Sequence, residues 1–177
     1  MAGIYTDLRV SIRKAALAAL SEFTNPIVIF SHENGPEPSV SYVVVNILNI
    51  AQQGHHSTST QTTTDYKLDV RVVYEVMVQF SFIGSLSGDM AQSFTQRINN
   101  VPVSREALTK NNLGFMRKSQ IRRAPQKRET HWVEYHNVDA TFNYIVNTSD
   151  ISDWVESVIV DSEQTGVFTV PEGIIIP

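Results

Sequence analysis

The sequence predicts one α/β (α+β) domain: a mainly antiparallel β-sheet with long hairpins, flanked by an N-terminal helix and one or two further helices. Three observations support this class. An amphipathic helical stripe opens the chain, and two long segments further on alternate apolar and polar residues. With 177 residues, 42% hydrophobic and 18% charged, the chain has the size of a single domain with an ordinary core. We expect that domain to span residues 1–160, with 161–177 as a C-terminal extension.

Residues 6–23 have the pattern of an amphipathic helix. Thr6 is the expected N-cap, and Pro26 prevents the helix from continuing past Asn25. The small residues in the middle of the stripe would let the helix approach a sheet closely. The predicted buried stripe consists of Leu8, Ile12, Ala15, Ala16, Ala19 and Phe23.

Two strands are predicted in the first half of the chain. Residues 41–50 are apolar at both odd and even positions, which is typical of a strand covered on both faces, and we place them centrally in the sheet. Residues 66–83 carry apolar side chains at nine consecutive even positions, the pattern of a half-exposed strand. At about 3.3 Å per residue this strand would approach roughly 60 Å, so we expect a bulge or a projecting end. The polar residues 51–65 between the strands predict a hairpin tip, mobile from Ser57 to Thr64.

Two helices follow the long strand. Ser87 and Asp89 begin the first of them, and Pro102 is expected to end it. Ser104 is the expected cap of a short helix that runs through Asn111.

A second hairpin is predicted from strands at 115–123 and 131–148. In the later strand the apolar residues change from odd to even positions, which predicts a bulge near His136 and Asn137. After it, Asp150 or Ser152 is expected to cap a last helix with Trp154, Val155 and Val158 on it.

Residue types for catalysis do not converge anywhere in the sequence. Cysteine is absent, and there is no glycine-rich phosphate loop, no HExxH and no GxSxG. His55 and His56 are adjacent, so in an extended chain they point to opposite sides, and a metal site needs three or four converging ligands. We therefore expect no enzyme activity, no catalytic residue, no metal and no cofactor.

Export and membrane insertion are also not expected. The N-terminus lacks a basic stretch followed by an apolar one, and no apolar run approaches the roughly 18 residues that cross a bilayer. The sequence predicts a soluble, unexported protein without a membrane partner.

Charge is the informative feature. The net charge is −4, yet the segment from Arg117 to Arg128 holds six basic residues and no acid, and the chain from Glu129 onward holds nine acids and no Lys or Arg. A molecule with both surfaces can pair head to tail with further copies, and such contacts close into rings. The candidate interface residues are basic Arg117, Lys118, Arg122, Arg123, Lys127 and Arg128, and acidic Asp150, Asp153 and Glu156.

Two other interpretations of this charge pattern stay open. The two segments can be separately solvated surfaces. The basic segment can also be a nucleic-acid patch, although it lacks interleaved aromatic residues on which bases stack.

Several segments together resemble the phage neck terminator, or tail terminator, proteins of long-tailed bacteriophages, over roughly residues 5–160. The likeness is in the order of elements and in short words such as NGPEPS before a strand and VSREAL followed by LG. The matching segments are NGPEPSVSYVVVNILNIAQQGHH, the alternating strand after it, INNVPVSREALTKNNLGFMRKSQIRRAPQ and THWVEYHNVDATFNYIVNTSDISDWVESV.

The resemblance implies a structural α/β subunit of the virion neck. Such subunits form hexameric rings that end the tail tube and join it to the head connector, and DNA passes through the lumen. The implied partners are further copies, a tail tube protein or sheath, and head–tail connector proteins, with assembly in the host cytoplasm. Another neck or tail component, such as a head completion ring or a tube protein, is the alternative. Residues 57–64 and 161–177 look longer than this family's core requires.

Overall fold

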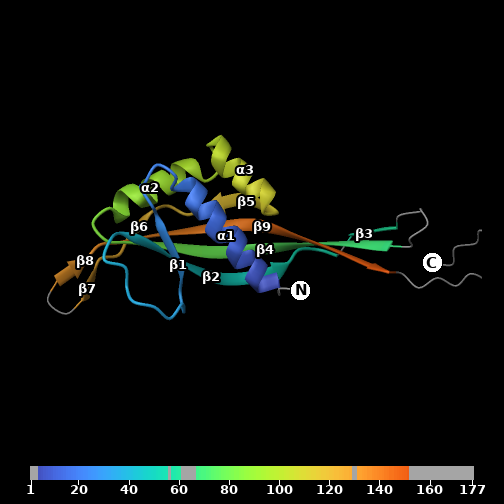
Figure 1. Cartoon of the computed structure of the whole chain (residues 1–177), viewed down its shortest axis with the longest axis horizontal. Coiled ribbons are helices and arrows are strands. Elements are labelled where there is room, and N and C mark those ends of the chain that lie inside the picture. Colours follow the sequence, from blue (N-terminus) through green and yellow to red (C-terminus); the bar gives the residue numbers. More distant parts are fainter. Residues whose placement is uncertain (1–3, 56, 61–66, 129–130, 152–177) are drawn as a thin grey trace, which may run out of the picture. The chain divides into compact units, whose positions relative to one another are not determined.

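The computed structural model describes residues 4–55, 57–60, 67–128 and 131–151 (Figure 1). The chain divides into a first unit, residues 1–57 with 71–147, and a second unit, residues 58–70 with 148–177. The expected boundary at residue 160 lies outside the described residues. The elements are α1 (Ile4–Ala19), β1 (Ile27–Phe30), β2 (Tyr42–Gln52), β3 (Ser57–Thr60), β4 (Lys67–Ile83), α2 (Ser87–Arg97), α3 (Pro102–Lys110), β5 (Leu113–Lys118), β6 (Arg122–Arg123), β7 (Gln126–Arg128), β8 (His131–Val133) and β9 (Tyr135–Ile151).

The main sheet has the strand order β1-β2-β4-β9-β5, with β3 paired to β4 and β6 to β9, while β7 and β8 form a separate pair. Strand β1 is parallel to β2, and β2 is antiparallel to β4, as β5 and β6 are to β9. The predicted α+β class, with a mainly antiparallel sheet, is confirmed. β4 occupies the middle of the order, and β2, which we expected there, lies one strand away.

All three helices contribute to one apolar core on the same face of the sheet (Figure 1). The even positions of β4 point into it, since Val76, Val78, Phe80 and Phe82 are buried. The Phe80 ring lies 4.5 Å from that of Phe94 on α2, centroid to centroid. Aromatic pairs at this spacing stabilise a core beyond the area that they bury.

Helix α1 buries the predicted stripe but has different ends. It begins at Ile4, so Thr6 lies inside the helix and is not its N-cap. The helix ends at Ala19 because the chain then turns, reaching a left-handed φ of 52° at Asn25 just before Pro26. Phe23 nevertheless packs against the core from this turn.

The boundary between the second and third helices differs from the predicted one. Pro102 does not close α2, which ends at Arg97, but starts α3, where its missing N–H costs nothing. The N-cap of α3 is Val101, with an extended backbone, and Ser104 lies buried inside the helix. Ser87 does begin α2, as predicted.

The apolar parity change along β9 has a cause other than a bulge. Arg122 pairs with Asn137 and Arg123 with His136 without a register shift. Even and odd positions of β9 face opposite sides of the sheet. Val138 and the even positions after it enter the main core, while Tyr135 joins a smaller apolar cluster on the other face. The register shifts that the structure does show lie in β2, between Ile47 and Asn49, and in β5, between Phe115 and Arg117.

Near the end of β9 the expected last helix falls largely outside the described residues. Strand β9 continues to Ile151, so Asp150 lies in a strand and is not a helix cap. Ser152, Trp154, Val155 and Val158 are not among the described residues. Strand β1 was not predicted, because four residues are too few to show a period.

Candidate interaction surfaces

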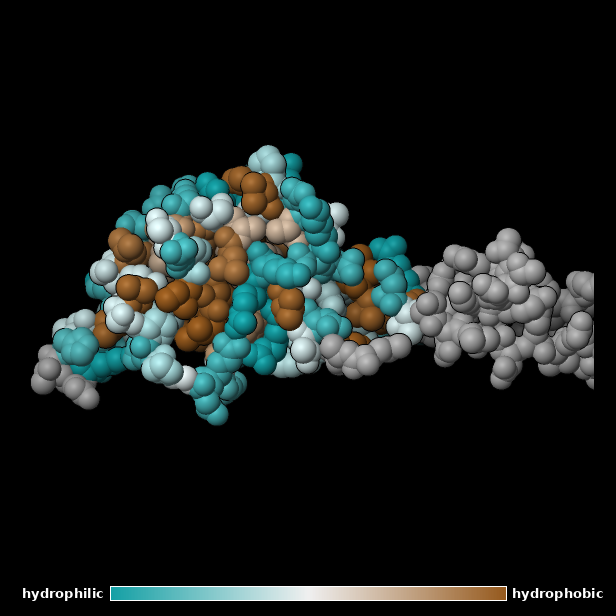
Figure 2. All heavy atoms as spheres, in the orientation of Figure 1, coloured by the Kyte–Doolittle hydropathy of each residue, from teal (hydrophilic) through white to brown (hydrophobic). Residues whose placement is uncertain are grey.

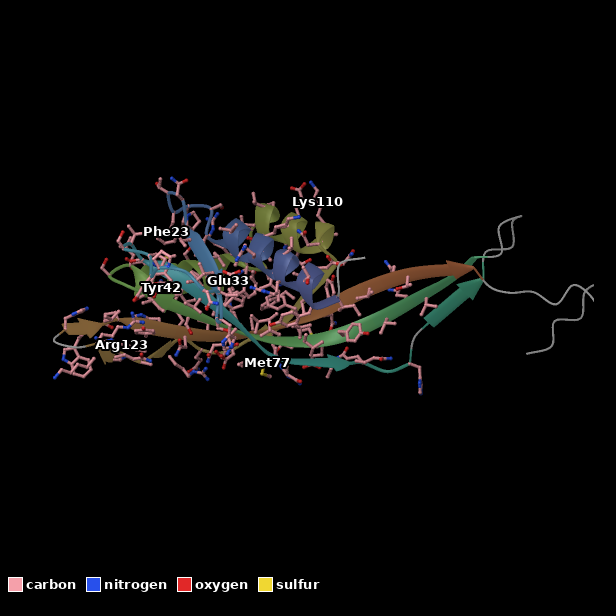
Figure 3. The ribbon with its side chains drawn as sticks, turned by 60° about the horizontal axis from the view of Figure 1, so that its bottom comes forward. Phe23, Glu33, Tyr42, Met77, Lys110 and Arg123 are labelled. Atoms are coloured by element: carbon pink, nitrogen blue, oxygen red, sulfur yellow. The ribbon has the colours of Figure 1, made fainter. Side chains whose placement is uncertain are left out.

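The sheet face opposite the helices is polar over its middle strands. Met77 on β4 lies on this face, pointing away from the helices (Figure 3). Beside it, the side-chain amide of Gln79 donates to Asp139 Oδ1 over 3.3 Å. Between β5 and β9, Thr141 is buried and its hydroxyl accepts a hydrogen bond from Arg117 Nε over 3.4 Å. On this face, side-chain hydrogen bonds and ion pairs link neighbouring strands, whereas helices pack on the other face.

The predicted basic segment, here called the basic arm (residues 117–128), runs along β5, β6 and β7. Each of its four arginines is ion-paired within the chain. The pairs are Arg117 with Glu75 at 3.1 Å, Arg122 with Asp139 at 2.6 Å, Arg123 with Glu134 at 2.5 Å, and Arg128 with Glu37. The hydrogen bonds from Arg123 lower the pKa of Glu134. Glu134 and Asp139 belong to the acid-only C-terminal part of the sequence, so two acids of that part already pair with the basic arm within one subunit.

Three of these pairs are exposed. The side chains of Arg117, Arg122 and Arg123 are 53% to 66% exposed. Exposed pairs contribute only about 0 to 1 kcal/mol each, because water and salt screen them. These arginines can therefore exchange partners at little cost.

Arg128 is held more firmly, in a cluster with the smaller apolar core. It donates to the hydroxyl of Tyr135, and its guanidinium lies 5.5 Å from the centre of that ring. The hydroxyl of Tyr42 donates to Glu37 over 2.6 Å; this bond, and then Arg128, lower the pKa of Glu37. Burial, followed by the bond to Glu37, raises the pKa of Tyr42 to about 12. Tyr42, Ile83 and Tyr135 are buried together, so this cluster anchors the base of the β7–β8 hairpin.

The other candidate interface residues are placed less fully. Lys118 Nζ donates to the backbone carbonyl of Thr95, and Lys127 is exposed on β7. Asp150 lies in β9, with its side chain outside the described set. Asp153 and Glu156 fall outside the described residues, so their contact with the arm stays a prediction.

Sequence reasoning missed an aromatic residue beside the basic arm. In the β7–β8 hairpin Trp132 pairs directly with Lys127, and 68% of Trp132 is exposed. The two strands have three residues each, too short for any periodicity to show their register.

A shallow groove lies between α1 and α3. Its volume is about 430 Å³, and Lys14, Val103, Glu106, Ala107, Lys110 and Asn111 line it. Lys110 of α3 (Figure 3) pairs with Glu106 at 2.6 Å. Small-molecule sites are concave and enclose most of their ligand, which this open groove does not.

On the side of the first unit seen in Figure 2, apolar surface alternates with polar side chains.

The described part of the chain has no candidate metal site. Three or more His, Cys, Asp or Glu side chains nowhere gather there closely enough to hold a metal ion. None of the described helices has the length and apolar character to span a bilayer.

The family model described as "Phage neck terminator protein" matches residues 14–168. The chain belongs to this family. The neck terminator matches no curated protein. Among solved structures it is similar to a chain titled "Virion of native gene transfer agent (GTA) particle", with 15% identity and a TM-score of 0.28, over 83% of this chain and 93% of that one.

The two units of this neck terminator carry opposite net charge. The first unit has thirteen basic and ten acidic residues, a formal net charge of +3. The second has Lys67 as its one basic residue against eight acids, a formal net charge of −7. The division into units does not follow the charge split predicted from the sequence, because Glu129, Glu134 and Asp139 of the acid-only segment belong to the first unit.

Proposed function

We propose that this neck terminator is a structural subunit of the virion neck, where six copies form a ring that ends the tail tube and joins it to the head connector. DNA passes through the lumen, and the subunit performs no catalysis. The observation that carries the proposal is the family match over residues 14–168. The opposite charges of the two units support it, because a molecule with two complementary surfaces associates head to tail and can close a ring.

The ring contact uses the exposed arginines of the basic arm. Arg122 and Arg123 exchange their carboxylate partners within the subunit for Asp150, Asp153 and Glu156 of a neighbouring copy. The exchange is nearly neutral for each pair, since exposed pairs are weak on both sides. Complementarity then sets which surfaces meet, and burial elsewhere in the contact supplies the affinity.

A second candidate, a nucleic-acid binding module, has one observation in its favour. Trp132 beside Lys127 supplies an aromatic residue next to basic ones, as bases and phosphates require. Against it, the arginines of the arm already face carboxylates of their own chain. A head completion ring or a tube protein is the alternative within the virion.

Electron microscopy tests the ring directly. We expect the isolated protein to be monomeric or weakly associated at low concentration, and six-fold rings to form when tail tubes are added. Stable dimers or twelve-fold rings at tube ends would contradict the proposal, as would free subunits that leave the tubes uncapped.

Charge reversal tests the contact. We expect R122E/R123E to abolish ring formation on tubes while the subunit stays folded, because attraction becomes repulsion at every interface. K14E/K110E makes the same change in net charge outside the arm and is the matched control. Adding D150K, D153K and E156K to the arm variant should restore part of the assembly.

The outcomes separate the candidates. Thermal unfolding reports whether the subunit stays folded, since the reversal also removes the pairs with Asp139 and Glu134. If R122E/R123E forms normal rings that no longer retain DNA, the basic arm contacts DNA, and the binding-module candidate is favoured. An unfolded variant would assign the two arginines to subunit stability, and the interface hypothesis would be wrong.

A further inference from the structure

The β7–β8 hairpin has one face toward the rest of the first unit and one away from it. Side chains of directly opposed residues in a strand pair lie on the same side. Arg128 and Val133 belong to the inner side, because Arg128 contacts Glu37 and Val133 packs against the smaller apolar core. Lys127 and Trp132 alternate with them and therefore lie on the outer side, where both are exposed.

The hairpin is anchored at its base. The N–H of Ala124 donates to the carbonyl of Tyr135 over 2.9 Å, and Ala124 packs against the smaller core. Just before β9, the carbonyl of Glu134 accepts from the N–H of Gly84 over 3.1 Å. The indole is thus carried on a positioned support, so little ordering is needed when a partner binds it.

An exposed indole of this kind suits a protein partner. Tryptophan is enriched among the few residues that dominate binding energy, because it buries a large rigid surface with few rotatable bonds. The neighbouring charges decide the partner's chemistry. Arg123, before the hairpin, and Arg128, within it, already face carboxylates, whereas Lys127 next to the indole is exposed. A partner surface with apolar side chains and an excess of carboxylates matches this pair.

The second unit of another copy has that chemistry. It carries eight acids against one basic residue. Within residues 148–177 the acids stand among large apolar residues, as in the sequence DWVESVIVD from Asp153 to Asp161.

We propose that Trp132 and Lys127 of one copy dock on the acidic second unit of the next copy, and that this is the apolar centre of the ring contact. The inference rests on the proposed ring function and names the residues that give the contact its affinity. The basic arm then supplies the charged rim around it.

Substitution tests the contribution of the indole. We expect W132A to weaken association between copies more than tenfold by analytical ultracentrifugation, and to reduce ring occupancy on tail tubes. V40A is the matched control, because Val40 is also exposed, at 59%, but lies outside the hairpin. K127E should weaken association as well, and it offers a second exposed position should W132A fail to fold.

Fluorescence and crosslinking test the location. The chain has two tryptophans, so W154F leaves Trp132 alone, and its emission should shift to the blue as copies associate. A photo-crosslinking amino acid at position 132 should link to residues 148–177 of a differently isotope-labelled copy.

The outcomes distinguish this inference from the ring proposal. Rings of W132A and K127E that equal the control would overturn the inference and leave the ring function intact. Crosslinks to residues of the same copy, to a tube protein or to DNA would also overturn it. Crosslinks between copies in an assembly that is not six-fold would support the contact and contradict the hexamer.

Discussion

The two faces of the main sheet are built on different chemistry. On the helix-covered face, Phe80, Phe94 and Phe142 pack into a closed apolar core. On the other face, Arg122, Asp139 and Gln79 link the strands through polar contacts, beside one small apolar cluster. The free energy of folding comes mainly from the first face, because buried apolar area stabilises far more than exposed ion pairs. The second face can therefore change its contacts without unfolding the subunit.

The largest effect is expected from the core. F94A should lower the free energy of unfolding by about 3 to 5 kcal/mol, because it removes a buried ring and leaves a cavity. Urea denaturation measures it. L86A, at an exposed site beside the same helix, should change stability by no more than about 0.5 kcal/mol. If F94A and L86A lower the free energy of unfolding by similar amounts, the helix-covered core does not contribute more stability than the exposed surface.

An intermediate effect is expected at the smaller cluster. Y42F removes the hydrogen bond to Glu37 and should lower the free energy of unfolding by about 1 kcal/mol, with the ring still buried. The same change removes the main cause of the lowered pKa of Glu37, so that pKa should rise toward its ordinary value. Carboxyl NMR titration measures this rise, and an unchanged pKa would show that Arg128 alone sets it.

Acid should loosen the hairpin before it unfolds the core. The pKa of Glu37 is lowered in the folded subunit, so its stabilising contribution is present above the ordinary value of 4.5 and is lost as pH falls through the lowered one. We expect proteolysis within residues 124–133 to accelerate over that range. In E37Q the rate should be high and nearly independent of pH. Slower cleavage in acid would contradict this assignment of the anchor.

The smallest effect is expected on the polar face. D139N removes the charge that pairs with Arg122, and should lower the free energy of unfolding by at most about 1 kcal/mol, because the arginine is half exposed. Thermal unfolding at low and high salt checks this, since salt should shrink the difference further. A loss above about 2 kcal/mol would mean that the face is structural in its own right.

The sequence predicted elements wherever a long period was present. The alternation through residues 66–83 places β4 within one residue, and the α1 stripe is buried as expected. Predictions failed where one residue suits two roles. Pro102 can end a helix or begin one, and Thr6 and Ser104 are good caps that lie inside helices. The parity change in β9 was misinterpreted because a strand between two apolar clusters looks like a strand with a bulge.

The interaction surfaces were predictable only as composition. Basic and acidic segments are visible in the sequence, but the partners of Arg117 and Arg128 are Glu75 and Glu37, which precede them by 42 and 91 residues. Such pairs depend on strand order, which local patterns do not contain. Trp132 was missed for the same reason, since its place beside Lys127 depends on the register of a short hairpin.

The outer strands of the sheet restrict how copies can meet. β1 has four residues, and β5 is interrupted by a register shift and ends in Arg117 and Lys118. Short, irregular or positively charged outer strands prevent two sheets from joining through backbone hydrogen bonds, the route by which β-proteins aggregate. Backbone pairing is indifferent to sequence, whereas side-chain contacts depend on shape and charge. A subunit protected in this way can accumulate in a crowded cell and still associate only where a complementary surface is offered.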